Sequence, residues 1–136
     1  MDIILDKGAY TPTRAHDLDA GYDLRAPEDK VLRPNDSIII DTGVHFQIPK
    51  GYVGMLKSKS GLNVNYGVTG EGVIDAGYTG SVVAKLYNNS SEFIKFKKGD
   101  KIIQIVFLPI FTPELTEVKK FEETERGSNG FGSTGA

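Results

Sequence analysis

Glycine and proline are spread so evenly along this chain that few stretches could hold a helix. The 136 residues include 16 Gly and 6 Pro, and both types interrupt helices, glycine through its backbone entropy and proline through its missing N–H. Between these breaks, apolar and polar residues alternate with the period of two that a half-buried strand requires. The spacing predicts an all-β domain of eight or more short strands, arranged as a sandwich, jelly roll or barrel.

The alternation is clearest in residues 44–48 and 82–86, and each of these segments runs into a turn sequence. A short helix would fit after Ser60-Gly61. Further β-rich runs, each flanked by Gly, Pro, Asn or Asp, lie at residues 31–32, 38–40, 52–56, 93–96 and 102–107.

The charge balance and the absence of cysteine exclude several classes of function. With 16 Lys and Arg against 18 Asp and Glu, the chain has no excess of positive charge with which to bind a long polyanion. We therefore expect no nucleic-acid partner. The lack of Cys removes disulfides, thiolate metal sites and cysteine nucleophiles. No signal-like apolar region and no stretch of about 18 apolar residues occurs. We therefore expect no membrane association and a cytoplasmic protein, in its own cell or in a host cell if it is viral.

The composition changes near Glu122 to a segment rich in glycine, serine and threonine, in which Phe131 is the only large apolar residue. Such a segment cannot bury enough surface to offset its ordering entropy. We expect a β-barrel domain over residues 1–121 and a mobile Gly-rich lid over residues 122–136, although a frayed end without function remains the alternative. The letters of residues 130–135 fit a dinucleotide-binding turn, but the strand and helix that such a turn requires are missing.

Two further segments have the residue types of a nucleotide site. Residues 57–61 combine lysines, serines and a glycine, which suits either a phosphate patch or a solvated loop. Residues 72–80 set Asp75 and Tyr78 among apolar residues and glycines. A carboxylate there can act as a general base and an aromatic ring can support a sugar, while a plain Asp-Ala-Gly turn of a β-hairpin is the alternative.

The order of five segments is more specific than any one of them. The chain reads AGYDL at 20–24, KSGL at 59–62, GVIDAGYTG at 72–80, GDKIIQ at 99–104 and RGSNGFGSTG at 126–135. This series resembles the five motifs of the homotrimeric deoxyuridine triphosphatases (dUTPases) over nearly the whole chain. The resemblance implies a distorted jelly-roll-like β-barrel and a homotrimer with three active sites at subunit interfaces. It also implies hydrolysis of dUTP to dUMP and pyrophosphate with Mg²⁺, which keeps uracil out of DNA and supplies dUMP for dTMP synthesis.

The resemblance assigns roles to individual residues. Asp75 would be catalytic and activate the water that attacks the α-phosphorus, Tyr78 would stack on the deoxyribose, and Asp23 would orient the water shell of the metal. The remaining residues would bind substrate: Lys59, Ser60, Gly61 and Gln104 the phosphates or the water leading to them, main-chain groups of Gly72, Val73 and Ile74 the uracil edge, Arg126 the γ-phosphate, Phe131 the uracil face, and Gly132, Ser133 and Thr134 the triphosphate.

This chain departs from the family pattern in three places. Lys59 stands where the family usually has Arg, which keeps the charge but gives up the bidentate fork. Asn129 stands where a glycine pair is common, so we expect Asn129 to take a positive φ. The segment between Gly61 and Gly72 is slightly short. The rival hypotheses are a dCTP deaminase of the same superfold, a nucleotide-sensing regulator that hydrolyses slowly, and a structural β module with a frayed tail.

Overall fold

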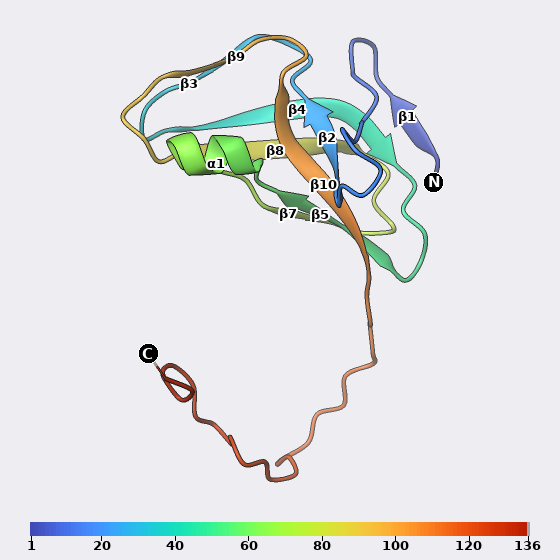
Figure 1. The fold of residues 1–136 in the computed structure, drawn as a ribbon. Coiled ribbons are helices and arrows are strands. Elements are labelled where there is room, and N and C mark those ends of the chain that lie inside the picture. Colours follow the sequence, from blue (N-terminus) through green and yellow to red (C-terminus); the bar gives the residue numbers. More distant parts are fainter. Residues whose placement is uncertain (136) are drawn as a thin grey trace.

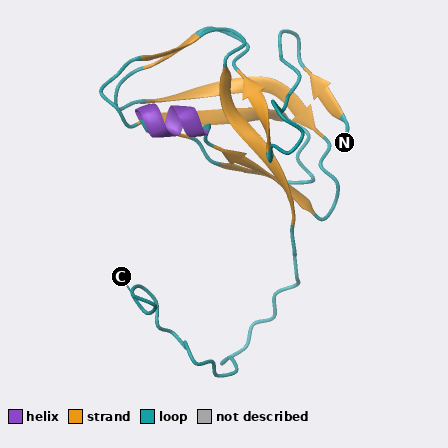
Figure 2. Ribbon diagram, viewed as in Figure 1, coloured by secondary structure: helices purple, strands orange, loops and turns teal. Residues whose placement is uncertain are grey.

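The computed structural model describes residues 1–135, and its strands form two four-stranded antiparallel sheets around one apolar core (Figures 1 and 2). The first sheet has the order β1-β4-β8-β6, with bounds Ile3–Leu5, Ser37–Phe46, Ser81–Asn88 and Val68–Thr69. The second has the order β2-β10-β5-β7, with bounds Gly21–Arg25, Lys101–Pro109, Tyr52–Lys57 and Gly72–Ile74. A separate pair joins β3 (Lys30–Leu32) to β9 (Ile94–Phe96). The predicted all-β, jelly-roll-like fold is confirmed.

The predicted short helix is present as α1 (Ser60–Tyr66), directly after β5. It begins after Lys59, whose backbone is extended, and ends at Gly67, whose N–H donates to the carbonyl of Asn63. Gly67 is left-handed, a conformation that ends many helices. No helix in the described part of the chain has the length and apolar character needed to cross a membrane.

The core forms as the strand alternation predicted. Along β8, Val82, Ala84 and Leu86 are buried, while the residues between them are exposed. Side chains from the second sheet complete the apolar cluster from the opposite side, because alternate residues of a strand point to the same face. These buried residues of the second sheet include Leu24, Leu56, Ile103 and Ile105.

The strand boundaries differ from the predictions in two ways. The runs at 38–40 and 44–48 belong to one ten-residue strand, β4, whose pairing with β8 shifts register between Asp41 and His45. Ile48 is buried but lies beyond this strand. Strands β1, β2 and β6 were not predicted, because the apolar residues of β1 do not alternate with polar ones, the sequence of β2 has no period of two, and β6 has only two residues.

Asn88 at the end of β8 ties three segments together from a buried position. Its Nδ2 donates to the carbonyl oxygens of Leu32, Arg33 and Glu92 at 3.3, 3.1 and 2.7 Å. Its Oδ1 accepts from the backbone N and the hydroxyl of Ser90 at 3.0 and 2.7 Å. The side chain therefore joins β8 to the end of β3 and to the loop before β9.

Replacing Asn88 with alanine is expected to lower the free energy of unfolding by about 2–3 kcal/mol, because several buried polar groups lose their partner at once. Urea denaturation at one fixed protein concentration measures this loss. Asn89→Ala is the matched control, since Asn89 is exposed and makes a single side-chain bond, to the carbonyl of Gly67. Equal losses in the two variants would contradict the assigned role.

Candidate active site

Asp23 on β2 is a buried carboxylate held by two ammonium groups. Its Oδ1 is paired with Lys59, and its Oδ2 lies 3.1 Å from the Nζ of Lys101. Burial alone raises the pKa of Asp23, but the hydrogen bonds and the charges of Lys59 and Lys101 outweigh it and hold the pKa below its ordinary value. Asp23 is therefore an anion at neutral pH and is already neutralised by the protein.

Gln104 on β10 lies beside Asp23, because the two residues are register partners. Its Nε2 donates to the carbonyl of Ser58 at 3.0 Å. The other end of the amide rests against Gly21, where any Cβ would collide with it. These contacts fix the Gln104 side chain and bring parts of three sequence motifs, with Asp23, Lys59 and Gln104, to one end of the second sheet.

Lys59, Ser60 and Gly61 form the start of α1 in the same region. Lys59 is partly buried against Asp23, whereas Ser60 and Gly61 are exposed. The first N–H groups of any helix lack acceptors within the helix. The backbone N–H groups of Ser60 and Gly61 are therefore available as donors, in addition to the Ser60 hydroxyl. The structure therefore groups cationic, hydroxyl and amide donors around Asp23, which we name the phosphate-type cluster: Asp23, Lys59, Ser60, Gly61, Lys101 and Gln104.

Lys101 is a member of this cluster that the motif comparison did not single out. It lies in the fourth motif, next to Asp100, and looks like one of many surface lysines in the sequence. The only available signal was its place three residues before Gln104, but a spacing of three does not itself put two side chains at one carboxylate. Pairing with β2 brings Lys101 close to Asp23.

β7 is an edge strand of the second sheet. It pairs with β5 through Gly72 opposite Leu56 and Ile74 opposite Gly54, and within residues 1–135 no strand pairs with its other side. Gly72 packs closely on Leu56, since a Cβ there would lie 2.9 Å from a methyl carbon. An edge strand leaves alternate backbone N–H and C=O groups unpaired.

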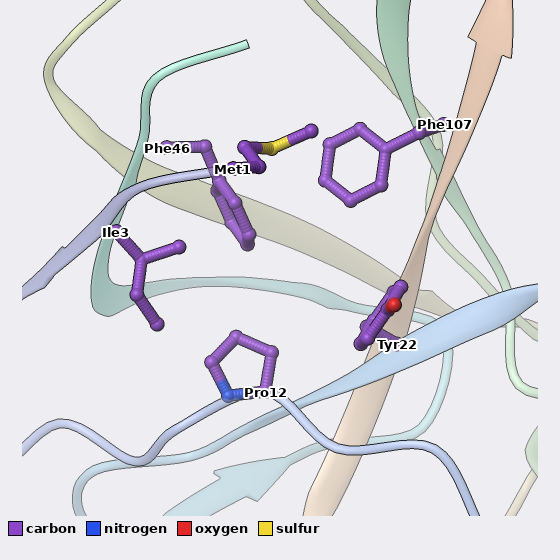
Figure 3. Close-up of a pocket in the computed structure, with 6 residues that line it drawn as sticks. All are labelled: Met1, Ile3, Pro12, Tyr22, Phe46 and Phe107. Atoms are coloured by element: carbon purple, nitrogen blue, oxygen red, sulfur yellow. The ribbon is translucent and has the colours of Figure 1, made fainter.

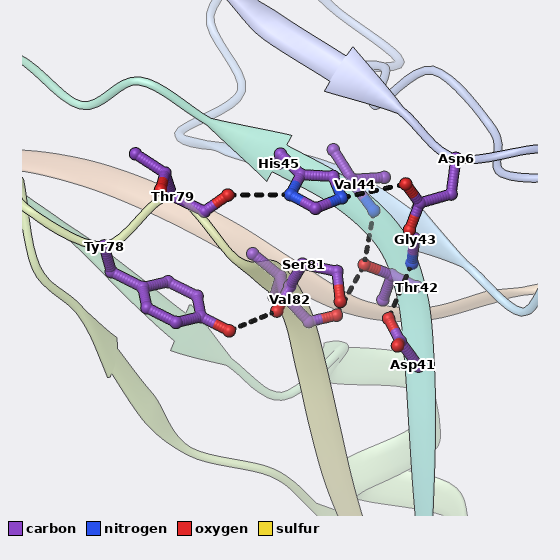
Figure 4. A network of polar contacts seen from close by, with 10 residues as sticks. All are labelled: Asp6, Asp41, Thr42, Gly43, Val44, His45, Tyr78, Thr79, Ser81 and Val82. Carbon is purple, nitrogen blue, oxygen red and sulfur yellow. Dashed lines mark hydrogen bonds and ion pairs between the residues drawn. The ribbon is translucent and has the colours of Figure 1, made fainter.

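Residues 75–80 connect β7 to β8, which belong to different sheets. The alternative interpretation of this segment as the turn of a β-hairpin is therefore wrong. Asp75 is exposed, and its carbonyl accepts from the N–H of Tyr78 at 3.0 Å. The hydroxyl of Tyr78 donates to the carbonyl of Ser81 at 2.8 Å (Figure 4). The ring lies against Gly80 closely enough to exclude a Cβ there. The Asp75 carboxylate is thus open to water, three residues before a tyrosine whose hydroxyl is fixed.

The phosphate-type cluster and Asp75 are well separated within one chain. Asp75 follows Ile74, whose partner on β5 is Gly54, whereas Gln104 is opposite Lys57. Gly54 and Lys57 are three residue steps apart along β5, and Asp75 lies one step further along than Ile74. These four steps correspond to roughly 13 Å, and the two strand spacings from β7 to β10 add roughly 10 Å sideways. The described hydrogen bonds and ion pairs include none between the two groups. One chain alone does not bring Asp75 to Lys59 and Gln104.

The C-terminal segment leaves the barrel after β10 and extends away from it (Figure 1). Its last backbone hydrogen bond to the body joins Ile110 to Gly51 at 2.9 Å. Beyond this point the large apolar side chains are exposed: Phe111, Leu115, Val118, Phe121 and Phe131. The division into a barrel of residues 1–121 and a lid of residues 122–136 stays a prediction.

Within the single chain, the predicted tail residues contact neither the phosphate-type cluster nor the segment with Asp75 and Tyr78. Arg126 donates through Nε to the carbonyl of Asn129 at 2.9 Å, and residues 126–135 are exposed. The expected positive φ at Asn129 is wrong, because Asn35 is the only non-glycine residue with positive φ in the described chain. The turns of the tail instead use Gly127 and Gly132, because glycine adopts positive φ without steric penalty. Phe131, Ser133 and Thr134 likewise have no contact with the barrel in this arrangement.

An apolar hollow near the N-terminus does not fit a nucleotide. It lies between β1, β2, β4 and β10, and aromatic rings form much of its wall (Figure 3). None of the side chains that line it is charged, so no side chain there could neutralise a triphosphate. The lining residues are Met1, Ile3, Pro12, Tyr22, Phe46 and Phe107.

Comparison with known proteins identifies one family over nearly the whole chain. The dUTPase family model matches residues 7–135. Proteins named deoxyuridine 5'-triphosphate nucleotidohydrolase include one from Clostridium tetani, 40% identical over 97% of this chain and 93% of its own length. One from Clostridium novyi is 42% identical over 99% of both chains.

Solved structures give the same result. The dUTPase of Staphylococcus bacteriophage 80alpha with dUPNHPP superposes with a TM-score of 0.92 at 36% identity, covering 99% of this chain and 98% of that one. A mutant dUTPase of S. aureus phage phi11, described with a structural Mg(II) ion, has a TM-score of 0.82 at 34% identity, over 90% and 98% of the chains. This chain belongs to the dUTPase family. The predicted enzyme class, a hydrolase acting on a phosphoanhydride, is thereby confirmed.

Removal of the Lys101 ammonium group by Lys101→Met is expected to destabilise the fold by about 1–2 kcal/mol at pH 7. This is less than for a fully buried pair, because solvent reaches the lysine. A lowered pKa contributes stability above the ordinary value of 3.8 and loses it as the pH falls through the folded-state pKa. The difference from the unmodified protein should therefore shrink on acidification, as urea denaturation at several pH values measures.

Lys97→Met is the control for this measurement, since Lys97 is an exposed lysine directly after β9. It should leave stability unchanged at every pH. A Lys101→Met loss of the same size at low and neutral pH would argue against an ionic role for Lys101.

Proposed function

We propose that this protein hydrolyses dUTP to dUMP and pyrophosphate, with Asp75 as the general base. The observation that carries the proposal is the exposed Asp75 carboxylate in the same short connection as the fixed Tyr78, in a chain of the dUTPase family. The relatives named as deoxyuridine triphosphate nucleotidohydrolases support the same substrate. The product dUMP would be available for dTMP synthesis, and removal of dUTP would keep uracil out of DNA.

Asp75 suits the chemical step because it is accessible to water and has a partner nearby for the sugar. The carboxylate takes a proton from a water molecule as the water oxygen bonds to the α-phosphorus. The bond from this phosphorus to the bridging oxygen breaks, and pyrophosphate leaves. The ring of Tyr78 is held against Gly80. It would lie under the deoxyribose and would leave no room for a ribose 2′-hydroxyl.

The free edge of β7 suits recognition of uracil. The main chain from Gly72 to Ile74 would present N–H and C=O groups to the O4, N3–H and O2 of the base. Cytosine reverses this pattern at two of the three positions, with an amino donor at C4 and an acceptor at N3, while its O2 remains an acceptor. A site built around such bonds discriminates against the mispaired base by about 10⁴-fold.

Lys59 would have two anionic partners in the reaction, Asp23 and the substrate phosphates. Without substrate it is paired with Asp23. When a triphosphate arrives, Lys59 can turn to it, because Lys101 still neutralises the Asp23 carboxylate. Ser60, Gly61 and Gln104 would add contacts to the phosphates or to the attacking water. Phosphate binding would thus use the positive charge of Lys59, which the fold already places next to the site.

The residues present fit Mg²⁺ that is bound mainly by the substrate. Within residues 1–135 no group of three or more His, Cys, Asp or Glu side chains could form a protein cage for a metal. Asp23 has both oxygens engaged by lysines, so its role toward the ion would run through water, as is common for Mg²⁺ at phosphate sites. When bound, Mg²⁺ neutralises the phosphate oxygens and favours departure of pyrophosphate.

A homotrimer with sites at the subunit interfaces would bring the separated parts together. The support is the distance between Asp75 and the phosphate-type cluster within one chain, together with a tail that lies away from its own barrel (Figure 1). Arg126 would then reach the γ-phosphate and Phe131 the uracil face. Gly132, Ser133 and Thr134 would wrap the triphosphate, and closure would exclude bulk water.

A hydrolysis panel tests the activity. With Mg²⁺, pyrophosphate release from dUTP should exceed release from dCTP, dTTP and UTP by at least about 100-fold. Asp75→Asn should reduce turnover at least about 1000-fold while nucleotide binding persists, because the amide cannot take the proton. Comparable rates on all four nucleotides would overturn the proposal, and ammonia release from dCTP would favour a deaminase.

A mixing experiment tests the shared sites. Asp75→Asn and Lys59→Met chains are each expected to be nearly inactive alone. In mixed trimers, about a quarter of the sites should combine an intact Asp75 from one chain with an intact Lys59 from another, by random assortment. Turnover should recover to a similar fraction after co-expression.

The control for the mixing experiment is one chain that carries both changes, co-expressed with the Lys59→Met chain. It supplies no intact Lys59 and should recover no activity. Failure of the Asp75→Asn and Lys59→Met chains to complement one another would mean that both residues act within one subunit.

A further inference from the structure

His45 on β4 contacts two acceptors, one with each ring nitrogen. Its Nδ1 lies 2.7 Å from the carbonyl oxygen of Thr79, and its Nε2 lies 3.0 Å from Oδ1 of Asp6 (Figure 4). Neither a carbonyl nor an ionised carboxylate can donate a hydrogen. Only the doubly protonated imidazolium satisfies both contacts, because the neutral ring has a single N–H.

The backbone around His45 aims the ring at this position. The register shift in β4 is centred on Gly43, which has a φ of +67°. The carbonyl of Gly43 accepts from the N–H of Asp6 at 2.8 Å, and Thr42 Oγ1 donates to the carbonyl of Val82 at 2.6 Å. Asp6 is therefore anchored to the strand that carries His45, and that strand is anchored to β8.

Thr79 lies between the residue that carries the aromatic ring and the glycine on which the ring packs. Tyr78 precedes it, and Gly80 follows it. The turn is fixed at Asp75 by the Tyr78 N–H and at Ser81 by the Tyr78 hydroxyl. In the part of the chain that the structure describes, the His45 ring is the donor that holds the Thr79 carbonyl between these two points.

We infer that His45 is a positioning residue that holds the Tyr78 ring in place and thereby sets the preference for deoxyribose over ribose. The inference rests on the proposed function, since it concerns how the same site selects its sugar. Rejection of a 2′-hydroxyl depends on close approach of the ring, so a small displacement of residues 78–80 admits the larger sugar. His45 touches neither substrate nor reacting atoms and acts through Thr79.

The acidic groups around the His45 ring determine the pH range in which the ring is protonated and its contact with Thr79 is charged. Asp6 faces it from the segment after β1, and Asp41 acts on it from β4 itself. Asp2 lines the same shallow hollow, while the residues opposite His45 on β1 and β8, Ile4 and Ser81, are uncharged. The hydrogen bond to Thr79, followed by the hydrogen bond to Asp6, raises the pKa of His45 above 6.5.

The sign of the pH effect follows from this raised pKa. The charged contact is complete below the ordinary histidine pKa and is lost as the pH rises through the folded-state value. The ring and Asp6 are partly exposed, so solvent screens the effect and it should be modest. Selectivity for dUTP over UTP is therefore expected to fall, without collapsing, as the pH rises.

The test is the ratio of kcat/KM for dUTP to that for UTP, measured from about pH 5.5 to about pH 9. Both substrates share the triphosphate ionisation and Asp75, so the ratio cancels these effects. In the unmodified protein it should fall about two- to fivefold with increasing pH. His45→Gln should show the low value at every pH, and Asp6→Asn should move the transition to lower pH. His16→Gln, at the other histidine, should behave like the unmodified protein.

A ratio that is the same in His45→Gln and the unmodified protein at every pH would overturn the inference. A second measurement does not depend on catalysis: the backbone amide signals of Tyr78, Thr79 and Gly80 should titrate with the His45 ring in NMR spectra of the free protein. Amides that do not follow the ring would also overturn it. Failure to hydrolyse dUTP at any pH would overturn the proposed function instead, while amides that follow the ring would still support the positioning contact.

Discussion

The pairing of β10 with a neighbour on each side is the interaction on which the rest of the site depends. Its ladder to β2 brings Gln104 next to Asp23, and its ladder to β5 brings Gln104 next to Lys57. Because a slip of one residue would turn every side chain to the other face, the buried Ile103 and Ile105 enforce this register. Core packing thereby determines which polar residues meet on the outer face.

That register also explains why an acidic residue is tolerated in a buried position. An isolated carboxylate would lose its hydration, but Asp23 gains two ammonium partners from different parts of the chain. On the proposed function, Lys101 would keep Asp23 neutralised when Lys59 turns to the substrate phosphates. The electrostatics of the cluster and the geometry of the sheet are therefore not independent.

The sequence predicted the fold class well and the site in part. β8 and α1 were predictable because local pattern alone determines them. The partnership of Asp23 with Lys101 and of His45 with Thr79 was not, since each joins residues that only long-range strand pairing brings together. Alternation alone shows His45 only as a residue on the polar face of its strand, and the positive φ expected at Asn129 fell on glycines instead. A recognised series of motifs names residues, but it does not say which of them one chain can bring into contact.

The exposed edge of β7 affects which amino-acid substitutions this protein can accept during evolution. On the proposed function the base is read by main-chain groups, which every residue type except proline supplies in full. Val73 is exposed and leaves its side chain free to vary, whereas Gly72 is limited by its packing on Leu56. Most point mutations in β7 would thus leave base recognition intact. Substitutions that accumulate in this strand can change the contacts of the surrounding surface without changing which nucleotide is bound.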